Sequence, residues 1–181
     1  IPSGSAAGAL SVDVFSDASW GKHALSGWLV CVDKRVVSFG SRRQKVVALS
    51  SCESEYYAAA TAVLESLGIV ALLREIQGHR ATVPEGQDQL DQWVQVGGDK
   101  EIPLSLHIDS SSARSLCCRL GTGRLKHVPT KALWLQQLVS SGSLRVLKVR
   151  GELNPADVMT KLVTRAVRET LSPLIFGSPV A

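Results

Sequence analysis

The chain has 181 residues, of which 45% are hydrophobic and 20% are charged, and its net charge is +4 with a pI of about 9.0. These values are typical of one soluble globular domain with a sizeable core, and the mildly basic balance is compatible with nucleic-acid binding without establishing it. The densest apolar stretch, around residues 69–73, is far too short to span a bilayer, and no signal peptide opens the chain, so we expect no membrane association and an intracellular protein, cytoplasmic or nuclear, that is not secreted.

The four cysteines indicate a reducing compartment, because they form no C-x-x-C pair and suggest neither a disulfide framework nor a zinc site. They are Cys31, Cys52, Cys117 and Cys118. The chain begins with Ile1 rather than Met, so we expect a piece of a longer polypeptide or a processed chain. Small and polar residues over 1–10 predict an N-terminal tail or linker, followed by one domain over residues 11–163.

An alternating pattern over residues 11–17 predicts the first strand, which ends on Asp17. An acid at the end of a central strand is a candidate site residue. The alternative explanation for Asp17 is an Asx turn, since Asp is a common turn former.

Residues 26–32 and 35–39 predict an antiparallel strand pair joined by a tight turn at Asp33-Lys34. A basic run containing Arg42 and Arg43 follows. This run predicts either a solvated sheet edge or a contact with a phosphate backbone.

Residues 51–77 predict a long helix whose start carries two glutamates. Ser50-x-x-Glu53 fits a capping box, which gives Glu53 a structural role. Steps of three and four residues from Glu55 lead to a row of apolar residues that begins at Ala59. Glu55 therefore lies at the N-terminal end of the helix face that is expected to pack on the core. Burying an unpaired carboxylate is unfavourable, so Glu55 either has a partner such as a metal ion or stays hydrated at the rim of the core.

The stretch 79–101 shows no periodicity and predicts a long surface loop. Residues 103–109 predict the next strand, which again ends on an acid, Asp109. Two helices are expected between this strand and Gly142. His127, which precedes the second helix, is interpreted as a polar loop residue, with a phosphate contact as the alternative.

The final strand is predicted over residues 144–150, where apolar and basic residues alternate. Asn154-Pro155 then fits the N-cap and first position of a helix. Asp157 lies in the first turn, where the helix dipole by itself favours an acid. The remaining residues, 164–181, predict a C-terminal tail with at most one short helix.

Four acids therefore stand at element ends, and they are Asp17, Glu55, Asp109 and Asp157. Three antiparallel strands followed by helix, strand, two helices, strand and helix predict an α/β fold with a five-stranded mixed sheet flanked by helices. Sites in such sheets gather at the ends of the central strands. Carboxylates that converge there repel one another, and hard oxygen ligands select Mg²⁺ or Mn²⁺ over zinc to relieve that repulsion.

Four short motifs, in this order, resemble those of the ribonuclease H family. They are Ser16-Asp17-Ala18, Glu55-Tyr56-Tyr57-Ala58, Ile108-Asp109-Ser110 and Asn154-Pro155-Ala156-Asp157. The stretches 47–56, 124–127 and 156–161 narrow the resemblance to the ribonuclease H domain of copia-type LTR retrotransposon polyproteins, and the similarity covers about residues 12–162. Many family members carry a His in the loop before the last acid, whereas residues 150–156 contain none.

The resemblance implies a ribonuclease H-like fold and an endonuclease that hydrolyses the RNA strand of RNA–DNA hybrids, next to a reverse transcriptase domain in a polyprotein. It assigns catalysis, and the binding of two Mg²⁺ or Mn²⁺ ions, to Asp17, Glu55, Asp109 and Asp157. The candidates for backbone contacts are Arg42, Arg43, Lys126 and His127. Two alternatives stay open: another nuclease on the same fold, and a catalytically inert module that binds nucleic acid or tethers polyprotein domains.

Overall fold

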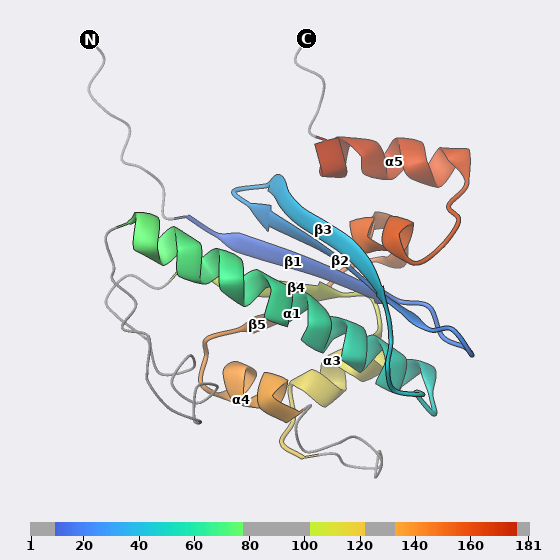
Figure 1. Cartoon of the computed structure of the whole chain (residues 1–181), viewed down its shortest axis with the longest axis horizontal. Helices are drawn as coiled ribbons and strands as arrows, with labels where there is room; N and C mark the ends of the chain where they lie inside the picture. The colour runs from blue at the N-terminus through green and yellow to red at the C-terminus, as the bar shows by residue number, and fades with distance from the viewer. Residues whose placement is uncertain (1–9, 78–101, 122–132, 177–181) are drawn as a thin grey trace.

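The structure is a computed structural model that describes residues 10–77, 102–121 and 133–176. The elements in chain order, with η for a 3₁₀-helix, are β1 (Val12–Ala18), β2 (Leu25–Val32), β3 (Arg35–Arg43), α1 (Ser51–Ile76), β4 (Leu104–Ile108), α3 (Ser111–Cys117), α4 (Trp134–Ser140), β5 (Arg145–Lys148), η2 (Gly151–Leu153), η3 (Pro155–Met159) and α5 (Arg165–Phe176) (Figure 1). The loop expected over 79–101 lies outside the described residues.

Five strands form one mixed sheet in the order β3-β2-β1-β4-β5, with β1 at the centre. β1, β2 and β3 pair antiparallel, while β4 pairs parallel with β1 and β5 pairs parallel with β4. The fold class predicted from the sequence is therefore confirmed. Asp33 and Lys34 form the expected two-residue turn, and both have the positive φ that a type I′ hairpin requires.

The parallel pairing of β1 with β4 brings two of the acids to one place. The register pairs Ser16 with Ile108. The next residues along each strand direction, Asp17 and Asp109, therefore emerge at the same edge of the sheet and on the same face.

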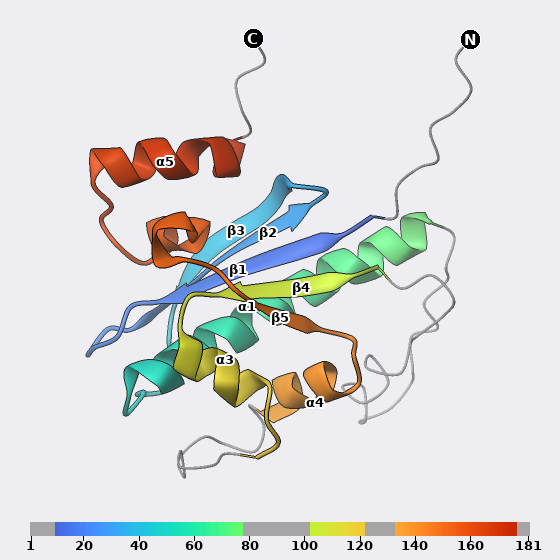
Figure 2. The same ribbon diagram turned by 180° about the vertical axis from the view of Figure 1, so that it is seen from behind.

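Helix α1 covers one face of the sheet and lies in front of it in Figure 1 and behind it in Figure 2. Its buried side is built mainly from small residues, among them the fully buried Ala58, Ala59 and Ala62, so the helix can approach the strands closely. The 26 residues of α1 are also long and apolar enough to cross a membrane by length and composition alone, which the short apolar stretch in the sequence did not indicate. Core helices share this property, and α1 packs on β1 and β2 as a core helix does.

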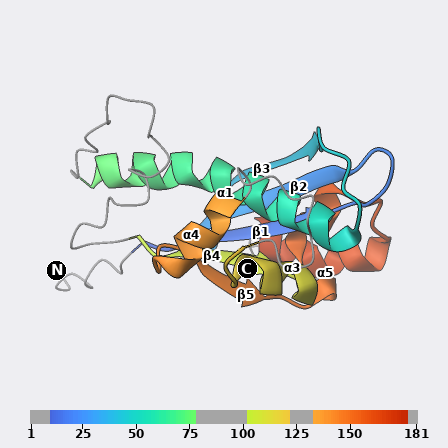
Figure 3. The ribbon, with the colours of Figure 1, turned by 90° about the horizontal axis from the view of Figure 1, so that it is seen from below.

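Helices α3 and α4 continue the same hydrophobic core. α3 contacts α1, and α4 contacts α3 (Figure 3). Their buried residues Leu116, Leu135 and Leu138 join the core cluster formed by α1 and the inner face of the sheet. One contiguous core therefore holds α1 and the ends of β1 and β4 in a fixed relation.

The 3₁₀-helix η3 packs on the opposite face of the sheet at Gly27 of β2. A Cβ atom on Gly27 would lie 2.6 Å from Thr160 Cγ2 and 2.8 Å from Met159 Cβ, so only glycine permits this approach. The sequence predicted a helix starting at Asn154-Pro155, and the structure shows a short 3₁₀-helix there. Its close packing on β2 places Asp157 near the end of β1.

The one short helix that the sequence allowed within 164–181, before Pro173, is longer in the structure and spans residues 165–176. These form helix α5, which contacts β3 and η3 and continues through Pro173. Leu171 is fully buried. Burial of apolar surface, which local sequence does not report, stabilises a helix that its proline would otherwise interrupt.

Gly27→Ala should lower the free energy of unfolding by about 1–3 kcal/mol, because the added Cβ overpacks the contact with Thr160 and Met159. Gly68→Ala is the matched control, because this helical glycine has nothing within 4 Å of an added Cβ. That change should stabilise the protein by about 0.5–1 kcal/mol. Urea denaturation measures both, and an equal response of the two variants would contradict the close packing of η3 on β2.

Candidate metal centre

Four acidic side chains converge at the edge of the sheet where β1 and β4 end. Carboxylate oxygens of Asp17, Glu55 and Asp109 all lie within 4.8 Å of one another. Asp157, from η3, joins them through Lys161, whose Nζ lies 3.1 Å from Asp17 Oδ1 and 3.2 Å from Asp157 Oδ1. The structure therefore brings the sequence-predicted acids together, while their roles in catalysis and metal binding stay predictions.

Asp17 is the buried member of this cluster, with a side chain that is 0% exposed. The Thr160 hydroxyl donates a hydrogen bond to Asp17 Oδ2, and the Lys161 ammonium donates to Oδ1. Sequence reasoning missed both of these residues. The available signal was that Lys161 follows Asp157 by four residues in the sequence. Residues four apart lie on the same face of a helix, so this spacing predicts a contact between the two side chains.

Glu53 and Glu55 have separate surroundings, as the sequence predicted. Ser50 Oγ accepts a hydrogen bond from Glu53 N at 3.2 Å, which is the predicted cap. The Glu53 carboxylate accepts from Leu49 N, one residue earlier than a capping box requires, and from the Tyr57 hydroxyl, both at 2.9 Å. Glu53 thus has a complete structural role.

Glu55 Oε2, in contrast, is buried and has no hydrogen-bond partner within the part of the chain that the structure describes. A buried carboxylate oxygen without a partner is strongly unfavourable. A cation bound between Asp17, Glu55 and Asp109 would remove this penalty, so the three acids form a candidate metal site.

Two polar side chains, those of Gln44 and Ser54, fix the start of α1 against the strand ends. Gln44 Nε2 donates to Ser26 Oγ at 3.0 Å and to the Ser54 carbonyl at 2.9 Å. Ser54 Oγ donates to the Ser19 carbonyl at 3.2 Å. Because Ser54 directly precedes Glu55, these bonds hold Glu55 beside the end of β1.

Asn154 fixes the start of η3 against β1, as Gln44 and Ser54 fix the start of α1. Its Nδ2 donates to the Ser16 carbonyl at 2.9 Å, and its Oδ1 accepts from Ala156 N at 3.2 Å. The predicted N-cap is therefore confirmed, and the same side chain ties η3 to β1 one residue before Asp17. Asp157 is positioned by this buried bond.

Burial and mutual repulsion raise the pKa values of the clustered carboxyls. Burial, followed by the charges of Asp17 and Asp109, raises the pKa of Glu55 to about 8 against the opposing charge of Lys161. Burial and then Asp17 raise the pKa of Asp157 to about 6. Burial and Asp17 also raise the pKa of Asp109. The cluster is therefore short of positive charge even with Lys161 in place.

The donor set is composed of carboxylate oxygens, which suits a hard divalent cation. Mg²⁺ and Mn²⁺ prefer such ligands, and proteins commonly hold them with a few carboxylates beside a phosphate-containing substrate. The residues present thus fit the ions that the ribonuclease H resemblance implies.

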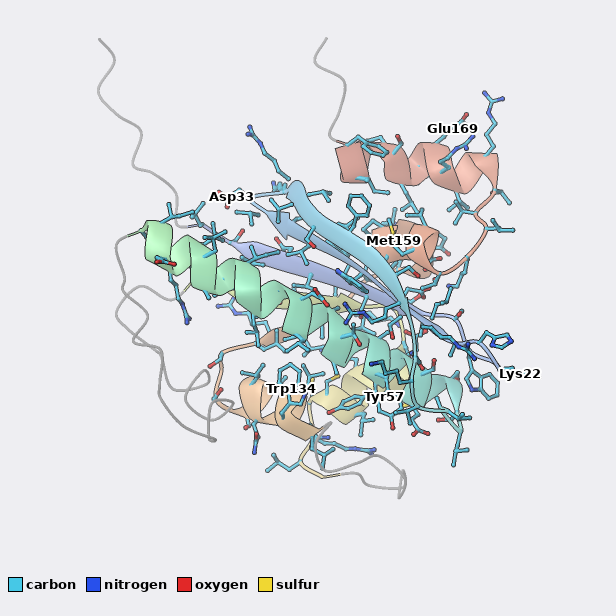
Figure 4. The ribbon with its side chains drawn as sticks, in the orientation of Figure 1. Lys22, Asp33, Tyr57, Trp134, Met159 and Glu169 are labelled. Carbon is cyan, nitrogen blue, oxygen red and sulfur yellow. The ribbon has the colours of Figure 1, made fainter. Side chains whose placement is uncertain are left out.

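A groove of about 490 Å³ lies between the end of β3 with the residues that follow it and one side of α1. Arg42, Arg43 and Lys45 line one side, and Tyr57 and Trp134, both labelled in Figure 4, line it from α1 and α4. None of the four acids lines the groove itself.

The predicted backbone contacts divide into three cases. Arg42 already pairs with Glu65 at 3.0 Å and lies 5.5 Å from the Trp28 ring centroid, which gives it a structural role. Arg43 lines the groove. Lys126 and His127 lie outside the described residues.

Sequence comparison relates the chain to retrotransposon polyproteins of plants. It is 30% identical over 151 residues to the retrovirus-related Pol polyprotein from transposon TNT 1-94 of Nicotiana tabacum, a match that covers 83% of this chain and 10% of the relative. It is 28% identical over 172 residues to the corresponding polyprotein from transposon RE1 of Arabidopsis thaliana, covering 92% of this chain and 10% of the relative. The chain thus spans about a tenth of the length of these curated relatives. No family model matches it.

Structure comparison places the fold among ribonucleases H. The RNase H1 from the halophilic archaeon Halobacterium salinarum NRC-1 is similar with a TM-score of 0.51 and 16% sequence identity, covering 90% of this chain and 98% of that chain. At this identity the likeness shows the fold. Together with the polyprotein relatives, it confirms the resemblance stated from the sequence.

The stability of the metal-free protein should fall as pH rises between about 4.5 and 8. Glu55 has a raised pKa in the folded state, so in this window the folded protein binds more protons than the unfolded chain, and each rise in pH favours unfolding. Melting temperatures in chelator should therefore drop over this range, and Glu55→Gln should flatten the drop. Glu75→Gln, at an exposed position of α1, is the control and should keep the parent's pH profile.

Millimolar Mg²⁺ should raise the melting temperature of the parent, because an ion that binds only the folded site stabilises it by linkage. Asp109→Asn should be at least as stable as the parent in chelator, since one repelling charge is gone, and should lose most of the gain with Mg²⁺. Asp33→Asn in the β2–β3 turn should respond to Mg²⁺ as the parent does. If Asp109→Asn keeps the full gain, Asp109 does not contribute to the site.

Proposed function

Because the chain is homologous to a segment of retrotransposon Pol polyproteins and has the ribonuclease H fold, we propose that it is a metal-dependent endonuclease that hydrolyses the RNA strand of RNA–DNA hybrids. The observation that carries this proposal is the convergence of Asp17, Glu55 and Asp109 within 4.8 Å, with a buried Glu55 oxygen that lacks a partner within the described residues. Asp157 completes the ligand set for two Mg²⁺ or Mn²⁺ ions.

When bound, such ions supply Lewis-acid stabilisation of the scissile phosphate and make an attacking water more acidic. The protein's part is to present fixed oxygens. Asp17 is held from both sides by Thr160 and Lys161 and is fully buried, so it provides a rigid inner ligand. Asp109 and Asp157 are partly exposed and would face the incoming phosphodiester.

The groove along α1 supports a path for the substrate backbone. Arg43 and Lys45 line it, and the groove also includes Ser26, which pairs with Ala18, the residue after Asp17. Cations along this groove suit a negatively charged strand, and its aromatic side chains suit stacking or sugar contacts. We therefore assign backbone contact to Arg43 rather than to Arg42, whose guanidinium is already engaged by Glu65.

The chain's place in a polyprotein belongs to the same proposal. The relatives are Pol polyproteins about ten times longer than the matched segment. We propose that the chain acts as one domain of such a polyprotein beside a reverse transcriptase domain, whose product would be the hybrid that this site cleaves.

A magnesium-dependent cleavage assay tests the function directly. We expect cleavage of the RNA strand in an RNA–DNA hybrid and none of duplex DNA or duplex RNA. Cleavage of either duplex in preference to the hybrid would favour another nuclease on the same fold. Binding of the hybrid without cleavage would favour an inert module.

Glu55→Gln should abolish cleavage, because it removes a ligand charge while preserving the shape of the side chain. Glu53→Gln is the matched control, since it lies two residues away and its carboxylate accepts only local hydrogen bonds. It should destabilise the helix start by about 0.5–2 kcal/mol and retain activity at temperatures where it is folded. Inactivity of a stably folded Glu53→Gln would reverse the assignment of the two glutamates.

A further inference from the structure

The Lys161 ammonium contacts two of the acids that are the proposed metal ligands, Asp17 and Asp157. Its Nζ lies 3.1 Å from Asp17 Oδ1 and 3.2 Å from Asp157 Oδ1. The Asp17 side chain is 0% exposed, so in the absence of metal this carboxylate depends on the ammonium to offset its burial. The charge of Lys161 also acts on Glu55 and Asp109.

The Lys161 ammonium is placed so that it can move away from the two carboxylates. Its side chain is 46% exposed, and it follows the last turn of η3, so its ammonium can move into solvent without disturbing the core. A divalent cation held by the Asp17 and Asp157 carboxylates would be repelled by the ammonium that already contacts both of them. The ammonium and the ion therefore compete for the same carboxylates.

We propose that Lys161 is a positioning residue of the site. Its ammonium holds the Asp17 and Asp157 carboxylates together before a metal ion binds, and the ion displaces it from them. This inference rests on the proposed function, because it requires the acids to be the metal ligands. It predicts that Lys161 stabilises the metal-free protein and weakens metal affinity, two effects of opposite sign that an ordinary surface ion pair would not produce together.

Mn²⁺ binding, followed by electron paramagnetic resonance of the free ion, and melting temperatures in chelator test this proposal without using activity. Lys161→Met should bind Mn²⁺ about tenfold more tightly than the parent, the scale expected when one unit charge beside a divalent ion is removed. Its melting temperature in chelator should be lower, and its gain on adding Mn²⁺ larger. Lys161→Arg, which keeps the charge, should stay close to the parent.

Lys148→Met is the matched control for loss of a nearby positive charge. The Lys148 ammonium donates to the backbone carbonyl of Asp109 and to Ser111 Oγ rather than to a carboxylate, so its removal should tighten Mn²⁺ binding less than Lys161→Met does. Lys161→Gln keeps a hydrogen-bond donor for Asp17 while removing the charge, and it provides the same comparison if Lys161→Met does not fold.

The outcomes separate the two proposals. Unchanged or weaker Mn²⁺ binding by Lys161→Met and Lys161→Gln, in a protein whose parent binds the ion, overturns the role of Lys161 and leaves the metal site intact. Failure of the parent to bind Mn²⁺ overturns the proposed function and this inference with it.

Discussion

The mutual repulsion of four carboxylates at the end of β1 is the interaction that the rest of this structure has to accommodate. Burial strengthens the repulsion, since fewer water molecules screen the charges, and burial followed by the charge of Asp17 raises the pKa values of Glu55 and Asp157. A fold selected for stability alone would replace some of these acids. The divalent cation that the proposed function requires would offset this repulsion.

Close packing on both faces of the sheet makes this arrangement possible. On one face, alanines of α1 allow the helix that carries Glu55 to approach β1, and Gln44 joins its first turn to the strand ends. On the other face, the missing side chain of Gly27 admits η3, and Asn154 fastens it to β1. The acids are held by rigid elements rather than by free loops, which is what a site with defined ligand positions requires.

The site also has its own positive charge, which belongs to the same segment as one of the acids. Asp157 and Lys161 are separated by a single turn, so the chain that introduces the last carboxylate also introduces a cation to offset it. Together with Thr160, this short segment organises the most buried acid of the cluster. Its link to metal binding would make the late part of the domain, and not only the strand ends, important for the proposed hydrolysis of hybrids.

The sequence by itself determined the five strands and the long helix, and it predicted the four acids as site residues. Alternation identified the strands, the Asp33-Lys34 turn joined two of them, and the Ser50 cap located the helix start, because each of these signals is local. Only the tertiary structure decided how the acids are supported. The bonds from Thr160 and Lys161 to Asp17 span more than 140 residues, the pairing of Arg42 with Glu65 depends on how β3 faces α1, and α5 forms because it can bury Leu171. Such contacts are set by strand register and layer packing, and no short-range periodicity in the chain encodes them.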